Sequence, residues 1–139
     1  MALENYYMSN QVLKVLIAED DPSILHLSRV TLAKEGFSVL TCTNGEDAIL
    51  EIKQNEIDLV IVDESMPKAK GNVVAHFIRE NDKTKHIPVI LITAENNPTH
   101  FNELLKTGLI NLFLPKPFSP KLLLNMVQLL LKSKDAAKK

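Results

Sequence analysis

The feature that most constrains this chain is a repeated alternation between short apolar runs and longer amphipathic segments. The runs are rich in Val, Ile and Leu and cover residues 12–18, 37–42, 58–62, 87–93 and 109–114. Runs of this length and composition are typical of strands that are buried on both faces of a parallel sheet. The segments between them predict helices. We therefore expect an α/β three-layer sandwich, with a five-stranded parallel sheet, helices on both faces and right-handed crossovers.

Capping residues support this division. Pro22 opens the first helical segment, and Asp21 directly before it is a suitable N-cap. Gly36 follows the same segment, where glycine commonly ends a helix. A last amphipathic segment, SPKLLLNMVQLLLKSK, predicts a helix after the fifth run.

The composition limits the class of protein. The chain has 139 residues, which suits one domain, and a net charge of −1 that argues against general nucleic-acid binding. Its single cysteine, Cys42, cannot form a disulfide within the chain, which favours a reducing cytoplasm. No apolar run approaches the ~18 residues of a membrane span. We predict an extension or leader over 1–11, with Met8 as an alternative start, a domain over 12–133 and a frayed tail over 134–139.

Polar side chains follow four of the five runs. They are Glu19, Asp20 and Asp21 after the first run, Asp63 after the third, Thr93 at the end of the fourth and Lys116 after the fifth. Each has an ordinary explanation when taken alone, and for Asp21 we prefer the N-cap. Ligands of open parallel sheets, however, bind at the carboxyl ends of the strands. Together these residues bring acids, a hydroxyl and an ammonium group to one edge of the sheet.

Electrostatics predict a cation at this edge. Glu19, Asp20 and Asp63 would lie close together, and two carboxylates about 4 Å apart repel by roughly 4 kcal/mol at an effective dielectric near 20. A divalent cation relieves this repulsion, and oxygen ligands favour magnesium, with manganese as the alternative. The histidines show no metal-ligand spacing.

Four motifs together resemble the receiver domain of bacterial two-component response regulators. They are LIAEDDP, DLVIVDESMPKAKG, VILITA and FLPKPF, and the resemblance runs from Leu13 to Lys132. It implies a sheet of flavodoxin-like order 2-1-3-4-5, as in chemotaxis regulators. It also implies that Asp63 accepts a phosphoryl group from a sensor histidine kinase or a histidine phosphotransfer protein.

The resemblance assigns metal ligands around Asp63. Asp20 would bind Mg²⁺ directly, Glu19 would act through water, and the carbonyl group of Ser65 would be a further ligand. Gly71 matches the glycine that follows the Met-Pro turn.

The resemblance also assigns the groups that respond to phosphorylation. Lys116 would pair first with the acceptor carboxylate and then with the phosphoryl oxygens, and a cis bond to Pro117 would hold its side chain over the site. Thr93 would turn toward the phosphoryl group. Phe113 would be the aromatic switch. The unusual Pro115 removes a backbone N–H, which is tolerable on an edge strand.

This interpretation makes the chain a phosphoacceptor signalling domain and not an enzyme acting on other substrates. Alternatives are a phosphorelay intermediate or a receiver cut from a hybrid kinase. A phosphatase of the haloacid dehalogenase type is a remote alternative, because such enzymes have an aspartate where Ser65 stands. We expect no direct contact with nucleic acid or membrane.

The last helix is more apolar than docking on a core requires. Its apolar arc covers roughly 220° at about 100° per residue, whereas a core-facing stripe needs only ~100°. The two flanks of the arc are Leu122, Met126 and Leu129 on one side, and Leu124, Val127 and Leu131 on the other. We predict that one flank stays partly exposed beside Phe113, as the surface for a downstream protein target or a homodimer. The alternative is that neighbouring helices cover both flanks.

Overall fold

The computed structural model describes residues 12–94 and 98–138 and contains five βα units. The predicted extension or leader over 1–11 lies outside the described residues. The elements are β1 (Lys14–Ala18), α1 (Pro22–Lys34), β2 (Ser38–Cys42), α2 (Gly45–Gln54), β3 (Leu59–Asp63), α3 (Gly71–Glu80), β4 (Val89–Thr93), α4 (Pro98–Lys106), β5 (Leu112–Pro115) and α5 (Pro120–Lys138). All strand pairs are parallel, in the order β2-β1-β3-β4-β5. This confirms the predicted fold class and strand order.

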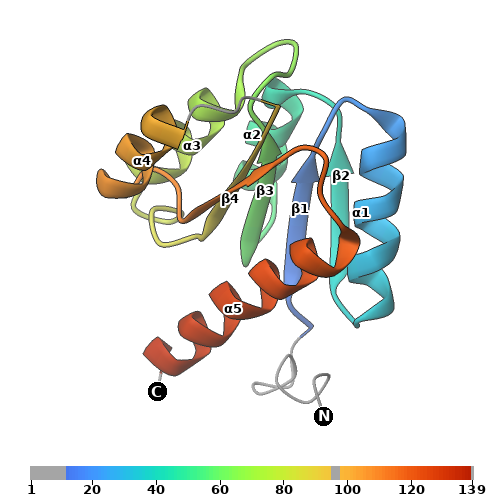
Figure 1. The fold of residues 1–139 in the computed structure, drawn as a ribbon. Helices are drawn as coiled ribbons and strands as arrows, with labels where there is room; N and C mark the ends of the chain where they lie inside the picture. The colour runs from blue at the N-terminus through green and yellow to red at the C-terminus, as the bar shows by residue number, and fades with distance from the viewer. Residues whose placement is uncertain (1–11, 95–97, 139) are drawn as a thin grey trace.

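The sheet is the middle layer of three (Figure 1). Helices α1 and α5 pack on one face, and α2, α3 and α4 pack on the other. Alternation along each strand supplies both cores, because successive side chains point to opposite faces. In β1, for example, Val15 and Ile17 join the α1/α5 core, whereas Leu16 and Ala18 join the other.

The predicted caps of the first helix are confirmed. The Asp21 side chain accepts hydrogen bonds from the backbone N–H groups of Ser23 and Ile24, at 2.9 and 3.3 Å. Gly36 has a φ of 95°, a conformation in which glycine avoids the steric penalty of a side chain. The chain can therefore turn directly from α1 into β2.

The fifth strand is shorter than its apolar run. β5 starts at Leu112, whereas the run starts at Leu109. Leu109 and Ile110 are buried, but their N–H groups donate to the carbonyl of Leu104 at the end of α4. The first apolar residues of the run therefore form a buried turn that ends α4, and the strand begins only after this turn.

The two flanks of α5 differ in exposure, as predicted. Leu122 and Leu129 are 43% and 59% exposed, whereas Val127 and Leu131 on the other flank are 0% and 1% exposed. The expected proximity of the exposed flank to Phe113 stays a prediction, and the Phe113 side chain packs against the core formed with α2, α3 and α4. Side chains of α5 pack on the opposite face of the sheet.

Candidate functional site

The carboxyl ends of β1 and β3 place Glu19 and Asp63 side by side. Ala18 of β1 pairs with Val62 of β3 in the parallel register, and Glu19 and Asp63 are the residues that follow them. Both are buried, at 0% and 2% exposure, whereas Asp20 is exposed. One carboxylate oxygen from each of the three residues lies within 4.8 Å of the others. The predicted acidic cluster is therefore present at the predicted edge.

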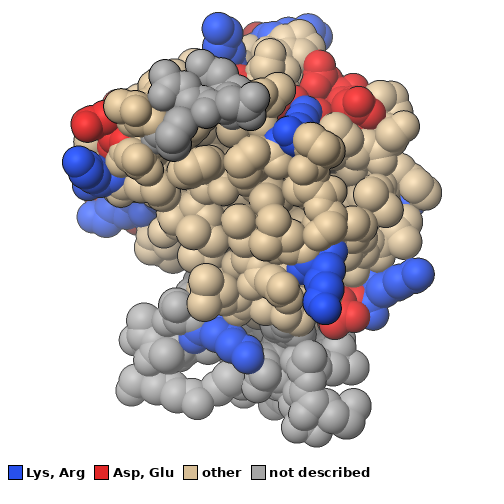
Figure 2. Space-filling view, viewed as in Figure 1, with Lys and Arg blue, Asp and Glu red and all other residues tan. Residues whose placement is uncertain are grey.

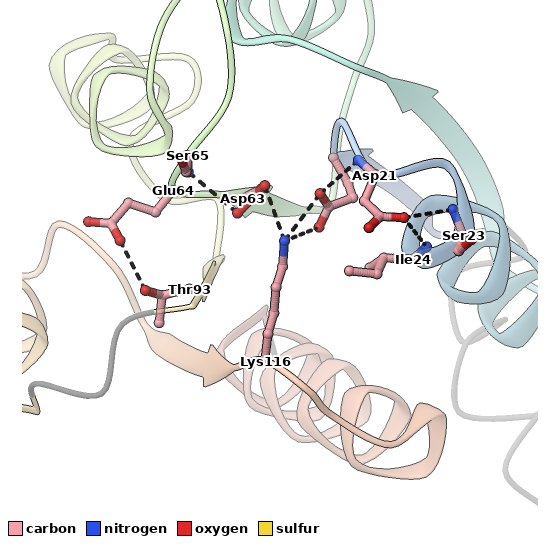
Figure 3. A network of polar contacts seen from close by, with 9 residues as sticks. Asp21, Ser23, Ile24, Asp63, Glu64, Ser65, Thr93 and Lys116 are labelled. Atoms are coloured by element: carbon pink, nitrogen blue, oxygen red, sulfur yellow. Dashed lines mark hydrogen bonds and ion pairs between the residues drawn. The ribbon is translucent and has the colours of Figure 1, made fainter.

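Lys116 joins the two buried carboxylates (Figure 3). Its Nζ lies 3.3 Å from Asp63 Oδ2 and donates to Glu19 Oε2 at 3.3 Å, with Glu19 Oε1 at 3.1 Å. Glu19 Oε2 also accepts a hydrogen bond from the backbone N–H of Asp21 at 3.1 Å. The opposite oxygen of Asp63, Oδ1, accepts a long hydrogen bond of 3.4 Å from the backbone N–H of Ser65. One ammonium group thus pairs with two buried carboxylates.

The surroundings raise the pKa values of both Glu19 and Lys116, for different reasons. The pKa of Glu19 is raised to about 7, mainly by burial and also by the Asp63 carboxylate, while the Asp21 N–H and Lys116 oppose the shift. Burial also lowers the pKa of Lys116, but its hydrogen bonds and charge attraction with Glu19 and Asp63 prevail and raise it. The ammonium form is therefore favoured, and Glu19 holds its negative charge only at a cost.

The end of β5 fixes the position of Lys116. β5 is an edge strand, paired only with β4 within the described sheet. The backbone N–H of Lys116 donates to the Thr93 carbonyl at 2.7 Å, so the nitrogen of Pro115 faces the open side of the sheet, where no donor is needed. The Lys116–Pro117 bond is cis, as predicted.

Thr93 ends β4 and is fully buried. Its hydroxyl donates to Glu64 Oε2 at 3.0 Å, and Figure 3 shows this contact on the side away from Lys116. The sequence interpretation did not identify Glu64. Asp63 pairs with Ile92, which places Glu64 beside Thr93, but this register follows from the strand pairing in the folded sheet.

The loop after β3 passes close to the site and needs two glycines. A Cβ on Gly71, the glycine that follows the Met-Pro turn, would lie 2.6 Å from the Asp63 carbonyl oxygen. A Cβ on Gly45 would lie 2.2 Å from the carbonyl oxygen of Ala69. The sequence interpretation did not identify the close approach of Gly45 to Ala69, because a glycine at a helix start is common.

The remaining predicted site residues are Ser65 and Phe113. Ser65 is exposed and contributes the N–H donated to Asp63. Phe113 is partly buried on β5 and stacks on Phe101 of α4, with ring centroids 5.2 Å apart. It is thus two strands away from Asp63, on an edge strand beside a helix.

The donor set fits a hard divalent cation. Carboxylate oxygens are the ligands that Mg²⁺ prefers. Glu19 Oε1 is also buried without a hydrogen bond among the described residues, although Lys116 lies nearby. A carboxylate cluster with incomplete hydrogen bonding is the arrangement that a bound cation would stabilise.

Charge is unevenly distributed over the surface. Figure 2 shows acidic side chains gathered toward the upper end of this face, with a broad uncharged region below, where β5 leads into α5. None of the described helices combines the length and the hydrophobicity that crossing a membrane requires.

Comparison with known proteins identifies the family. Residues 15–128 match the response regulator receiver domain. The chain is 33% identical over 128 residues to the probable transcriptional regulator ycf27 of Pyropia yezoensis, covering 92% of this chain and 51% of that regulator. It therefore spans about half the length of that relative. It is 28% identical to chemotaxis protein CheY1 of Helicobacter pylori, covering 88% of this chain and 100% of that protein.

A solved structure has the same fold. The chemotaxis response regulator CheY4 of Vibrio cholerae superimposes with a TM-score of 0.79 and 30% identity, covering 85% of this chain and 98% of that one. The family match also favours the receiver interpretation over the haloacid dehalogenase alternative. This chain belongs to the response regulator receiver domain family, the phosphoacceptor signalling domains of two-component systems.

Proposed function

We propose that this domain accepts a phosphoryl group on Asp63 from a sensor histidine kinase or a histidine phosphotransfer protein. The observation that carries the proposal is the position of Asp63. It is a buried carboxylate at the end of a central strand, in contact with Lys116 and within an acidic cluster. Phosphoryl transfer is catalysed mainly by positioning and by neutralising charge, and this site offers both.

The reaction is a transfer between two nucleophiles. A carboxylate oxygen of Asp63 attacks phosphorus, an oxygen–phosphorus bond forms, and the nitrogen–phosphorus bond of the donor histidine breaks. The histidine nitrogen keeps the electron pair, and the product is an acyl phosphate. Lys116 is the cation positioned to pair with the phosphoryl oxygens, because its Nζ already lies 3.3 Å from Asp63 Oδ2.

We propose Mg²⁺ as the cofactor, with Mn²⁺ as a substitute. Asp20, Asp63 and the Ser65 carbonyl would bind it directly, and Glu19 would bind it through water. When bound, the ion neutralises charge on the phosphoryl oxygens. The support is that one carboxylate oxygen from each of Glu19, Asp20 and Asp63 lies within 4.8 Å of the others. We propose that the chain promotes only its own phosphorylation and dephosphorylation and does not turn over other substrates.

Intact mass spectrometry after incubation with acetyl phosphate tests both parts of this proposal. We expect one added phosphoryl group in the wild type with Mg²⁺, and loss of nearly all of it with a chelator or in Asp63→Asn. Asp58→Asn is a matched control, since this carboxylate precedes the same strand and binds the Lys14 N–H at 2.8 Å. Phosphorylation of Asp63→Asn to the wild-type level would contradict the assignment.

We also propose that phosphorylation changes a contact surface on α5, used by a downstream protein or a second copy of the chain. The support is the exposed flank with Leu122 and Leu129. In sedimentation velocity with beryllium fluoride, Leu129→Lys should remain folded and lose any association seen in the wild type. Leu131→Lys should unfold, because Leu131 is buried. A fully associated Leu129→Lys variant would rule out this flank as the interface between copies.

The longer protein in which such a domain acts is also a proposal. A stand-alone regulator, a phosphorelay intermediate and the receiver of a hybrid kinase all require the same Asp63 chemistry. We favour a signalling role inside the cytoplasm, where the partner kinases transfer their phosphoryl groups.

A further inference from the structure

Glu64 lies between the end of β3, where Asp63 stands, and the residues Thr93 on β4 and His100 on α4. It follows Asp63 directly, and its Oε2 accepts the hydrogen bond from Thr93 Oγ1 at 3.0 Å. Its other oxygen, Oε1, lies 3.8 Å from Nε2 of His100 on α4. The Glu64 side chain is 24% exposed, so most of it is held within this group of contacts.

The contact with Thr93 is consequential because a hydroxyl group has one hydrogen to donate. While that hydrogen is donated to Glu64, it is not donated to a group on Asp63. An ionised carboxylate is a stronger hydrogen-bond acceptor than a neutral oxygen. Glu64 therefore competes with any group on Asp63 for the hydrogen of the Thr93 hydroxyl. Figure 3 shows Thr93 and Glu64 joined by this hydrogen bond, with Asp63 bonded separately to Lys116.

The contacts of Glu64 also lead toward Phe113. The rings of His100 and Phe101 meet edge to face with centroids 5.0 Å apart. Phe101 in turn stacks on Phe113 at 5.2 Å. Glu64 therefore touches both the hydroxyl beside the phosphoacceptor and the helix against which the aromatic ring packs.

We propose that Glu64 is a positioning residue that holds the Thr93 hydroxyl in its unphosphorylated arrangement and so opposes the switch. This role rests on the proposed phosphorylation of Asp63. The Thr93 hydroxyl can donate to a phosphoryl oxygen only after its hydrogen bond to Glu64 is broken. The cost of breaking that bond reduces the net free energy gained when the phosphoryl group binds Thr93. Removing the competing acceptor leaves the hydroxyl available before the phosphoryl group arrives.

Beryllium fluoride with Mg²⁺, a stable mimic of the phosphoryl group, provides a binding test by ¹⁹F NMR or calorimetry. We expect Glu64→Ala to bind it about fivefold more tightly than the wild type, the size of effect that one typical hydrogen bond allows. Glu64→Gln keeps an acceptor oxygen and should bind more weakly than Glu64→Ala. Thermal melting of each variant checks that the fold is intact.

Variants of Thr93 distinguish a positioning role of Glu64 from simple charge repulsion between Glu64 and the phosphoryl mimic. In a Thr93→Ala background, Glu64→Ala should have no further effect, whereas in a Thr93→Ser background, which keeps the hydroxyl, the tightening should return. If the tightening persists without the hydroxyl, or if Glu64→Gln equals Glu64→Ala, negative charge alone is responsible and the positioning role is wrong.

The outcomes also separate this role from the proposed function. A wild type that binds no beryllium fluoride, or an Asp63→Asn variant that binds it equally well, refutes the phosphoacceptor assignment and the role of Glu64 with it. A wild type that binds normally, with Glu64→Ala unchanged or weaker, refutes the role of Glu64 alone.

Discussion

Lys116 and Arg79 are both partly buried cations at opposite ends of the same sheet, and their partners differ in kind. Arg79, in the last turn of α3, donates to the carbonyls of Gly108, Lys85 and Ile87 at 2.9, 2.9 and 2.6 Å. It also donates to Asn111 Oδ1 at 2.8 Å. Lys116 instead faces ionisable carboxylates.

This difference distinguishes the Arg79 cluster, which is structural, from the Lys116 cluster, which is the candidate functional site. At the Arg79 end, each acceptor is neutral and matches the fixed geometry of the guanidinium group. Asn111 Oδ1 additionally accepts the N–H of Val89 at 2.8 Å, which ties the starts of β4 and β5 together. At the Lys116 end, negative charge exceeds positive charge and Glu19 Oε1 has no hydrogen bond among the described residues. We infer that the first cluster stabilises the fold, whereas the second is suited to bind a cation.

The largest expected effect tests the structural cluster. Arg79→Met should lower the free energy of unfolding by about 2–3 kcal/mol. Three backbone carbonyls, of which that of Ile87 is in a part-buried contact, would lose a charged donor. Urea denaturation monitored by circular dichroism gives the value. Phosphorylation of the remaining folded protein by acetyl phosphate should be unchanged, because the cluster lies at the far end of the sheet.

Arg29→Met is the matched control. Arg29 is an exposed arginine on α1 that contacts His26 one turn away, at 3.2 Å. Surface substitutions of this kind change stability by about 0.5 kcal/mol or less. Equal losses for Arg79→Met and Arg29→Met would show that the Arg79 hydrogen bonds contribute nothing beyond those of a surface side chain.

The sequence was sufficient for the fold and for the acidic half of the site. Strand alternation predicted the layers, and residues at strand ends predicted Asp63, Glu19 and Lys116, because parallel strands finish at one edge. Apolarity was less informative about boundaries, since it reports burial and not conformation. Leu109 and Ile110 are buried in a helix-ending turn, whereas Val12 is 48% exposed ahead of β1.

The Arg79 cluster and Glu64 were beyond the sequence interpretation for a physical reason. A single charged residue near a helix end or after a strand is most often solvated, and nothing local distinguishes Arg79 from Arg29. Its partners Gly108 and Asn111 lie 29 and 32 residues away in the chain. They become neighbours only through the packing of α3 beside the loop that precedes β5. Contacts of this kind depend on tertiary structure, which local patterns do not encode.

The smaller expected effect tests the functional cluster. Burial raises the pKa of Glu19 from 4.5 to about 7, so the native carboxyl group holds its proton more tightly than the unfolded one. Between these two values the native state binds more protons, and the stability of the metal-free protein should therefore fall as pH rises from about 4.5 to 7. We expect Glu19→Gln to remove this part of the pH dependence and, at pH 8, to raise the free energy of unfolding by on the order of 1 kcal/mol.

Urea denaturation between pH 5 and pH 8 measures both changes, with Glu80→Gln on α3 as the exposed control. Glu80→Gln should keep the wild-type pH dependence, because its carboxylate is exposed. The effect of Glu19→Gln should be smaller than that of Arg79→Met, since attraction to Lys116 offsets part of the cost of burying Glu19. If Glu19→Gln kept the wild-type slope and was destabilised instead, the carboxylate would be part of a satisfied structural network. Both ends of the sheet would then hold a satisfied structural polar cluster, and the distinction between a structural and a functional cluster would be wrong.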